Sequence, residues 1–421
     1  MTPTTPPPGP SDDRRAVETR EWLDSSSPRT LRALPGGIWA LGFGSLFMDA
    51  SSELVHSLVP VLMTSVLGAG MVTVGLIEGV AEATASITKV FSGALSDYLR
   101  KRKWVVVAGY GLGAIAKPLF PLASSVSWVF VGRFTDRIGK GIRGAPRDAL
   151  IADITPPELR GAAYGLRQAL DSVGAFVGPL LAIVLMASMA NDIRAVLWAA
   201  VIPAVIAVVL LAVAIREPEH APHPADERRR VTPTDVRRLS RAFWWVVLLG
   251  AVFTLARFSE AFLVLRAQDV GLAIGYVPAV MVVMNVAYAG IAYPAGRAAD
   301  RLRPRTLLMA GVGILMVADV ILAAATTPAH VFIGTACWGL HMGLTQGLLS
   351  KLVADTSAAA LRGTAFGIFN IVSGGAQLLA SAIAGALWST ISPSATFFAG
   401  ALFATVTMTG LIAYRDVRGA R

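Results

Sequence analysis

The chain has 421 residues, of which 54% are hydrophobic and only 15% are charged. Soluble domains usually contain about 45–50% apolar and about 25% charged residues, so this composition excludes an ordinary soluble enzyme. The formal net charge is +10, but the basic residues form short clusters between long apolar runs, and no nucleic-acid-binding patch is indicated. One cysteine, Cys337, permits neither a disulfide framework nor a cysteine metal site. The totals predict an integral membrane protein.

Twelve apolar runs approach or exceed the length of about 20 residues that a transmembrane helix needs. We therefore expect an all-α membrane protein with twelve spans and both chain ends on one side. A polar segment, 1–36, precedes the first span and is expected to be a disordered tail, and a polar linker, 216–241, divides six spans from six. The expected units are thus bundles at 37–215 and 242–415, with a short tail at 416–421. In chain order the runs cover 37–64, 71–96, 104–123, 127–152, 162–188, 195–215, 242–266, 275–295, 306–325, 330–354, 363–388 and 393–414.

Lysine and arginine occur almost entirely on one side of this predicted topology. They are present in the tails, the linker and the turns at 98–103 and 297–305, whereas the opposite loops have Arg194 and Arg266 as their only candidates. Because positive charge is retained on the cytoplasmic side, we expect a multi-pass protein of the cytoplasmic membrane with both termini in the cytoplasm.

The two halves repeat each other in sequence. LIADITPPELRGAAYG at 150–165 matches LVADTSAAALRGTAFG at 352–367, and GALSDYLRKRK at 93–103 matches GRAADRLRPR at 296–305. A third pairing joins Glu53 to Glu260 and Glu78 to Asn285. A duplicated six-helix unit is the architecture in which two bundles rock about a substrate site at the membrane midplane.

The repeated turn resembles the cytoplasmic 2–3 loop of major facilitator superfamily transporters, G-x-x-x-D-(R/K)-x-G-(R/K)-(R/K), although Tyr98 replaces its first basic residue. The resemblance covers nearly the whole chain beyond the tail and includes a fourth-span arginine, Arg133. It implies a secondary transporter without a cofactor, in which the turn aspartates form ion pairs that latch one conformation. The residues expected in this latch are Gly93, Asp97, Arg100, Lys101, Arg102, Gly296, Asp300 and Arg303.

The fifth predicted span resembles the motif of superfamily members that act as antiporters. Gly165 is followed by Gly174, Gly178 and Pro179 at matching intervals, although the final glycine pair of the motif is missing. Small residues at helical spacing also serve as ordinary packing surfaces, so both interpretations stay open. The antiporter interpretation implies export driven by an inward proton gradient.

Ionisable residues within the predicted spans are costly and are usually functional or paired. Most lie in the first half, so we expect the coupling chemistry there. Asp49 and Glu53 are the first candidates for proton carriers, followed by Asp171, because burial in a medium of low dielectric favours a neutral carboxyl. Static ion pairs with nearby arginines are the alternative for each acid, and for Lys89, Arg143 and Arg147 we expect structural pairing or snorkelling. The full set of expected cavity residues is Asp49, Glu53, His56, Glu78, Glu82, Arg133, Asp136, Arg137, Lys140, Arg167, Gln168, Asp171, Arg257, Glu260, Asn285 and Asn370.

Three substrate classes remain open from the sequence. FMDASSELVHSLVP at 47–60 resembles a bacterial branch of the superfamily that includes nickel-resistance exporters, and Asp49, Glu53 and His56 share one helix face. However, the arginines nearby would repel a metal ion, and we predict no dedicated metal site. An amphiphilic organic solute and an anion bound by arginines are the other two classes.

The remaining alternatives are a proton-coupled importer, a channel and a membrane-embedded enzyme. An enzyme is not indicated because the chain has no GxSxG, HExxH or GxxxxGK[ST] motif. The expected partners are therefore the lipid bilayer, protons and a small molecule or ion, with no nucleic acid, and we expect a monomer.

Overall fold

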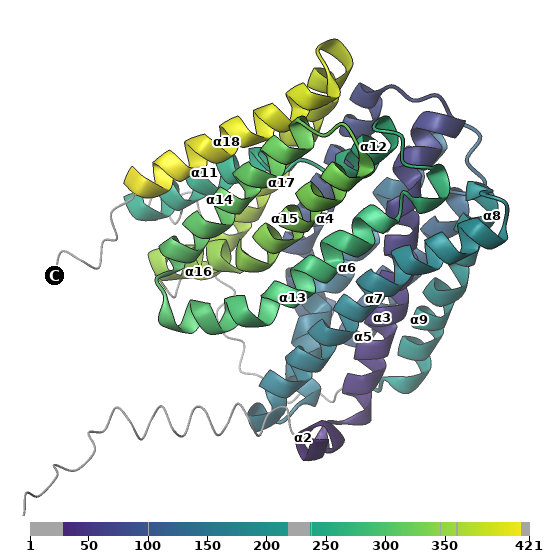
Figure 1. The fold of residues 1–421 in the computed structure, drawn as a ribbon. Coiled ribbons are helices and arrows are strands. Elements are labelled where there is room, and N and C mark those ends of the chain that lie inside the picture. Colours follow the sequence, from purple (N-terminus) through teal and green to yellow (C-terminus); the bar gives the residue numbers. More distant parts are fainter. Residues whose placement is uncertain are drawn as a thin grey trace, which may run out of the picture.

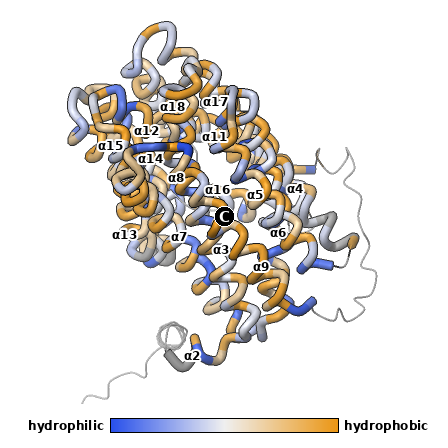
Figure 2. The backbone as a smooth tube through the Cα atoms, turned by 90° about the vertical axis from the view of Figure 1, so that its right-hand side faces the viewer, coloured by the Kyte–Doolittle hydropathy of each residue, from blue (hydrophilic) through white to orange (hydrophobic). Residues whose placement is uncertain are grey.

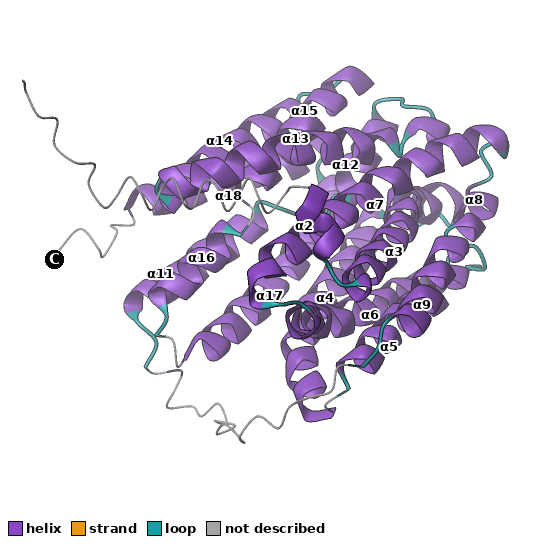
Figure 3. Ribbon diagram, turned by 90° about the horizontal axis from the view of Figure 1, so that it is seen from below, coloured by secondary structure: helices purple, strands orange, loops and turns teal. Residues whose placement is uncertain are grey.

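A computed structural model describes residues 28–99, 101–217, 236, 238–345, 347–358 and 361–413. Within these ranges the chain forms helices and no strand (Figures 1 and 3). The predicted terminal tail falls mostly, and the linker largely, outside the described residues, and so does the last segment, 416–421. Residues Pro28–Ala33, which belong to the predicted tail, form a short helix, α2.

The first bundle contains the six predicted spans of the first half, and the second bundle contains the other six. In the first half, the segments are α3 (Gly36–Val61) with η1 (Leu62–Val66), α4 (Met71–Leu99), α5 (Arg102–Ala116) with η2 (Lys117–Leu119), α6 (Val126–Ile154), η3 (Pro157–Leu159) with α7 (Arg160–Ser188), and α8 (Ile193–Ala199) with α9 (Val201–Ala214). In the second half, they are α11 (Arg241–Leu255) with α12 (Ala261–Asp269), η4 (Ile274–Tyr276) with α13 (Ala279–Arg301), α14 (Pro304–Ala323), α15 (Pro328–Thr345) with α16 (Leu348–Thr356), α17 (Arg362–Thr390) and α18 (Pro393–Ala413).

Length and hydropathy mark eight of the described helical segments as able to cross a membrane by themselves. Figure 2 shows apolar residues along most of the helices, with polar positions interspersed. The segment α6 is not among the eight, because its residues include a run of buried charges. The segment α11 is apolar but shorter. A charged helix can occupy the membrane when its polar groups face the bundle interior rather than lipid.

The seventh and tenth predicted spans are among those that are interrupted. The seventh is broken at 256–260, between α11 and α12, and in the tenth α15 and α16 are separated by a segment that includes Gly347, which has a left-handed backbone (φ +74°). Side chains of α17 satisfy backbone groups at the first break: Gln377 donates to the Arg257 carbonyl (2.9 Å), and the Ser259 amide donates to Ser381 Oγ (3.2 Å). Sequence hydropathy did not reveal either break.

The bundles pack most closely at the side opposite to the start of α3 and the end of α18. We call the end where α3 begins and α18 finishes the terminal side, and the other end the opposite side. At the opposite side, a methyl group added to Gly75 of α4 would lie 2.2 Å from the Ser381 carbonyl oxygen of α17, and one added to Gly385 would lie 2.3 Å from the Met71 carbonyl oxygen. The backbones of α4 and α17 are therefore in direct contact there.

Toward the terminal side the same two helices separate. A methyl group on Gly374 would be 3.3 Å from the Ser86 side chain, and one on Gly367 would be 3.6 Å from Val90. Between α7 and α13, Asn285 Nδ2 still donates to the Ala175 carbonyl at 2.9 Å, but a methyl group on Gly290 would meet nothing within 4 Å. Figure 1 shows the bundles diverging in this direction. The structure is thus closed at the opposite side and open at the terminal side.

Candidate functional site

Two adjoining cavities lie between the bundles. The first has a volume of about 430 Å³ and the second about 330 Å³. Both are bounded by five residues from α3, α4, α6, α7 and α13, so they form one continuous polar region. The shared residues are Glu53, Glu82, Lys140, Ala175 and Asn285.

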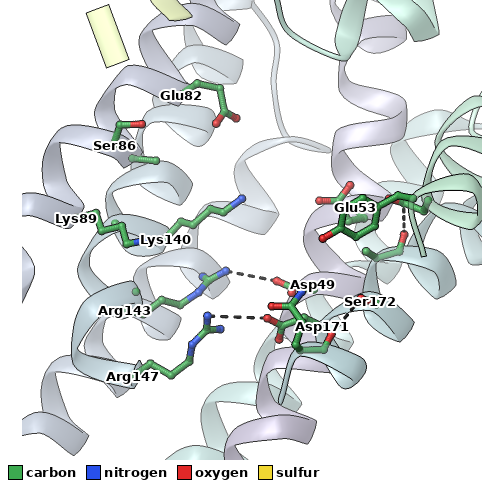
Figure 4. Close-up of a pocket in the computed structure, with 17 residues that line it drawn as sticks. Asp49, Glu53, Glu82, Ser86, Lys89, Lys140, Arg143, Arg147, Asp171 and Ser172 are labelled. Atoms are coloured by element: carbon green, nitrogen blue, oxygen red, sulfur yellow. Dashed lines mark hydrogen bonds and ion pairs between the residues drawn. The ribbon is translucent and has the colours of Figure 1, made fainter. Parts of the chain in front are cut away.

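Opposite charges face each other across the first cavity. Figure 4 shows the basic side chains of α4 and α6 on one wall and the acidic side chains of α3 and α7 on the other. Arg143 lies 3.8 Å from Asp49, and Arg147 lies 3.9 Å from Asp171. Lys89, Arg143 and Arg147 all line this cavity, so these basic residues belong to the site as well as to the structural pairs that we expected. At such distances the pairs are loose.

Lys140 is a cation of this site that makes no ion pair within 4.0 Å among the described residues. It extends from α6 into the space shared by both cavities, and its side chain is exposed there. In Figure 4 it faces the acids of α3 across the cavity. A cation with this placement is able to bind an anionic group of a solute.

Deeper acids form tight pairs with the charged residues of neighbouring helices. Glu78 of α4 pairs with Arg133 of α6, and both side chains are almost completely buried. Asp136 accepts a hydrogen bond from Lys117 at 2.7 Å, and Lys117 also donates to Ser52 at 2.9 Å. Since a buried charge is tolerated when it is paired and hydrogen-bonded, these groups fit the static role that the sequence left open.

The Glu82–Arg137 pair (3.0 Å) is as close as the tight buried pairs, but it lies at the cavity like the loose pairs. Its arginine is buried, but both members line the cavities. The cavity therefore retains access to one side of a firmly held ion pair.

His56 lies between two acids. Its Nδ1 is 3.6 Å from Glu53 Oε2, and its Nε2 is 3.8 Å from Glu78 Oε2. The ring thus connects an acid that lines both cavities with an acid of the buried layer. Among the described residues, no group of three or more His, Cys, Asp or Glu side chains is placed to hold a metal ion.

The second cavity combines charged and aromatic walls. Arg257, Phe258, Ser259 and Glu260 of the broken segment line it together with Trp338 of α15. The Arg257 guanidinium lies 5.5 Å from the centre of the Phe253 ring, and its buried Nε has no hydrogen-bond partner in the described structure. The aromatic wall suits an apolar body and the free guanidinium donor suits an oxygen acceptor.

Other predicted site residues are placed as follows. Gln168 lines the first cavity and accepts a hydrogen bond from Arg167 at 3.0 Å, while Arg167 pairs with Asp171 at 3.1 Å. Asn370 lies on α17 and lines neither cavity. It remains a sequence-based candidate only.

The glycine motif of α7 is a packing surface at two of its positions. Methyl groups on Gly174 and Gly178 would lie 2.4 Å from the carbonyl oxygens of Leu46 and Ala50, and Pro179 lies within the helix. A methyl group on Gly165, by contrast, would meet nothing within 4 Å. Close contact between α3 and α7 positions Asp49 and Asp171 on the same wall.

The predicted latch lies partly outside the described residues. Arg100 and the side chains of Asp97 and Asp300 are not described, and Lys101 and Arg303 immediately precede α5 and α14. Gly93 lies on α4 and Gly296 on α13. Arg102 pairs with Asp153 of α6 at 2.5 Å, a partner that belongs to the other repeated segment.

Sequence reasoning missed the contact between Ser259 and Glu78. Ser259 Oγ donates to Glu78 Oε2 at 3.2 Å, which joins the broken segment of the second bundle to the buried acid of the first. A lone serine in an apolar run carries no sequence signal. Only the break in the seventh span makes its role visible.

Comparison with known proteins is consistent with this architecture. The family model described as Major Facilitator Superfamily matches residues 41–284 and 260–420. An uncharacterized MFS-type transporter of Methanocaldococcus jannaschii is 32% identical over 89% of this chain and 94% of its own length. A tetracycline resistance protein, class G, of Vibrio anguillarum is 28% identical over 90% of this chain and 93% of its own.

Solved structures show the same fold at low identity. The nucleoside transporter NupG (D323A mutant) aligns with a TM-score of 0.72 at 13% identity, over 90% of this chain and 99% of its own. A POT family transporter in complex with 5-aminolevulinic acid aligns with a TM-score of 0.74 at 11% identity, over 90% of this chain and 95% of its own. The chain therefore belongs to the Major Facilitator Superfamily. It is a multi-pass membrane transporter of the secondary type and not an enzyme.

Proposed function

We propose that the protein is a proton-coupled antiporter that exports a small organic solute across the cytoplasmic membrane. The observation that carries this proposal is the contrast between the acids of the cavity and those beneath it. Asp49 and Glu53 have partners no nearer than 3.6 Å, whereas Glu78 and Asp136 are held in tight buried pairs. A loosely paired acid at a water-accessible wall can exchange protons and substrate in competition.

Export is supported by two further observations. The α7 glycines reproduce most of the antiporter pattern, and the protein of Vibrio anguillarum that is named for tetracycline resistance is similar over nearly its whole length. With both termini in the cytoplasm, the terminal side would be the cytoplasmic side, and the cavity would be open to a cytoplasmic solute. We propose that the working unit is a monomer.

The proposed solute is an organic amphiphile that carries an anionic or strongly accepting group. Lys140 and Arg257 line the second cavity without an ion pair within 4.0 Å in the described structure, and Phe258 and Trp338 supply an apolar face. Binding sites for small molecules typically combine such aromatic walls with a few polar groups. No observation among the described residues favours a metal ion as substrate over this class.

Everted membrane vesicles test the transport direction. A pH gradient, acidic inside, is imposed and followed with a fluorescent weak base while antibiotics, lipophilic dyes and divalent metals are added outside. For an antiporter, a substrate should dissipate the gradient, and vesicles without the protein should not respond. An importer would instead move protons together with the solute, so that adding a substrate outside would not release protons from the lumen. Failure of every compound to dissipate the gradient would contradict the export proposal.

A further inference from the structure

Two ionisable side chains in the second bundle are completely buried without partners. Asp319 of α14 is 0% exposed, and neither carboxyl oxygen has a hydrogen-bond partner in the described structure. His341 of α15 is likewise 0% exposed with both ring nitrogens unpartnered, but two aromatic rings, Phe253 and Trp338, enclose it. In contrast, the strongly buried acids of the first bundle are paired. Asp319 therefore differs from those acids, because no ion pair or hydrogen bond among the described residues stabilises its charge.

Asp319 and the second cavity are both close to the ring of Phe258. A methyl group added to Gly400 of α18 would lie 2.7 Å from Asp319 Oδ2 and 3.1 Å from Cε1 of Phe258, so the carboxyl and the ring edge flank the same point. Phe258 also lines the second cavity. The Phe258 ring therefore adjoins both the cavity and the space beside the carboxyl.

Phe258 lies on the break at 256–260, where the chain between α11 and α12 is not helical. Its neighbour Ser259 is bonded both to Ser381 of its own bundle and to Glu78 of the other. Because Ser259 and Glu78 belong to different bundles, a conformation in which α4 and α17 separate at the opposite side would lose this bond. A segment released in this way can change its backbone angles, as hinge segments do.

No described ion pair or hydrogen bond supplies a cation to Asp319. The facing helix α18 contains no Asp, Glu, Lys, Arg or His, and on α15 the ionisable groups are His330, Cys337 and His341. On the break, Arg257 and Glu260 line the cavity. Arg266 of α12 is the buried cation nearest along α14, but it donates to the carbonyl oxygens of Leu322, Ala323 and Ala325 and pairs with Asp269, and no described bond joins it to Asp319. Arg297 of α13 and Lys351 and Asp355 of α16 belong to the parts of those helices toward the terminal side.

We propose that Asp319 is a second proton-binding group of the transporter. Phe258 shields it in the conformation described here, which is closed at the opposite side, and uncovers it when the 256–260 segment rearranges. A carboxylate buried without a donor or cation costs several kcal/mol, so the shielded group carries a proton. Once the ring moves, water reaches the carboxyl, the O–H bond breaks and the proton passes to cavity water. This inference rests on the proposed proton-coupled function, because it adds a second site to the same cycle.

Carbodiimide labelling of the purified full-length protein tests the proposal without a known substrate. A water-soluble carbodiimide reacts with protonated carboxyls, and mass spectrometry locates the adduct. Phe258→Ala should raise the Asp319 adduct several-fold above the unmodified protein, and the adduct should decrease as pH rises, because the uncovered carboxyl then loses its proton. Ser259→Ala, which removes the bond to Glu78, should also raise the level of the Asp319 adduct.

Phe369→Ala is the matched control, since Phe369 packs against Gly250 of α11 and does not line the cavity. Phe258→Leu replaces Phe258→Ala if the latter does not fold. Adduct levels that are equal in the Phe258 variants and in Phe369→Ala would overturn the proposal. An adduct that is independent of pH would overturn it as well. A failed vesicle assay with normal labelling would instead count against the transport direction alone.

Discussion

Ser259 donates a hydrogen bond to Glu78 at 3.2 Å, and this bond crosses from one bundle to the other. The same carboxylate oxygen of Glu78 is bound by Arg133 and lies 3.8 Å from His56. One buried acid, Glu78, therefore connects the contact between the two bundles with the polar side chains that lead to the cavity.

Breaking the Glu78–Arg133 pair from one side should destabilise the protein. Glu78→Gln leaves the buried Arg133 charge without its counterion, which typically costs about 3–5 kcal/mol. The double variant Glu78→Gln/Arg133→Met removes the stranded charge and should recover part of the loss. Thermal unfolding in detergent, followed by tryptophan fluorescence, measures both effects. If the single variant unfolds at the same temperature as the unmodified protein, the pair contributes nothing to stability.

Asp49→Asn and Glu53→Gln should abolish proton-coupled flux while leaving membrane insertion intact. Asp49 lies 3.8 Å from Arg143 and Glu53 lies 3.6 Å from His56, so each substitution removes only a loose ion pair. Gradient dissipation in everted vesicles measures the flux, and the amount of folded protein in the membrane is compared in parallel. Glu158→Gln, an exposed position on η3, is the matched control. Unchanged flux in both variants would reject these acids as proton carriers.

Gly385→Ala should shift the protein away from the conformation seen here. The added methyl group would lie 2.3 Å from the Met71 carbonyl oxygen, so α4 and α17 must separate at the opposite side. The shift is read from the maleimide reaction rate of Ser381→Cys, a position that is 0% exposed, in a Cys337→Ala background. We expect the rate to rise several-fold. Gly290→Ala, where the methyl group meets nothing within 4 Å, should leave it unchanged, and equal rates in both variants would contradict the role of this contact.

Two glycines of the α7 motif should respond in opposite ways. Gly178→Ala forces a methyl group to 2.4 Å from the Ala50 carbonyl, and overpacking of this kind typically costs about 1–3 kcal/mol. Gly165→Ala meets nothing within 4 Å and should be neutral or stabilising, because alanine favours a helix over glycine by about 1 kcal/mol. Thermal unfolding compares the two. A similar loss in both variants would show that packing does not distinguish the positions.

Asp97→Ala should slow turnover more than it weakens substrate binding. The family turn implies that this aspartate stabilises one conformation rather than contacting the solute. The comparison uses the compound that responds in the vesicle assay, with its binding and its transport rate measured separately. Asp269→Ala, which removes a pair with Arg266 at the opposite side, serves as the control. Weaker binding with unchanged turnover would contradict the latch.

The sequence by itself determined the class of fold and the candidate acids. Apolar runs of membrane length and a repeat at 202–203 residues define two six-helix units, because the thickness of the bilayer and the cost of unpaired backbone groups leave few alternatives. It also singled out Asp49, Glu53 and Asp171 as acids within predicted spans, and it showed that Asp49 and Glu53 share one helix face.

The tertiary structure decided which charges are paired, because pairing depends on distances between helices that are far apart in the sequence. Periodicity shows that Glu78 and Glu53 share a bundle, but only packing gives Glu78 the partners Arg133 and Ser259 and leaves Glu53 at the cavity wall. The break at 256–260 was also hidden, since an apolar run has the same hydropathy whether it is helical or unwound. The isolation of Asp319 near Phe258 was hidden as well, because it follows from how α14, α18 and the broken segment meet.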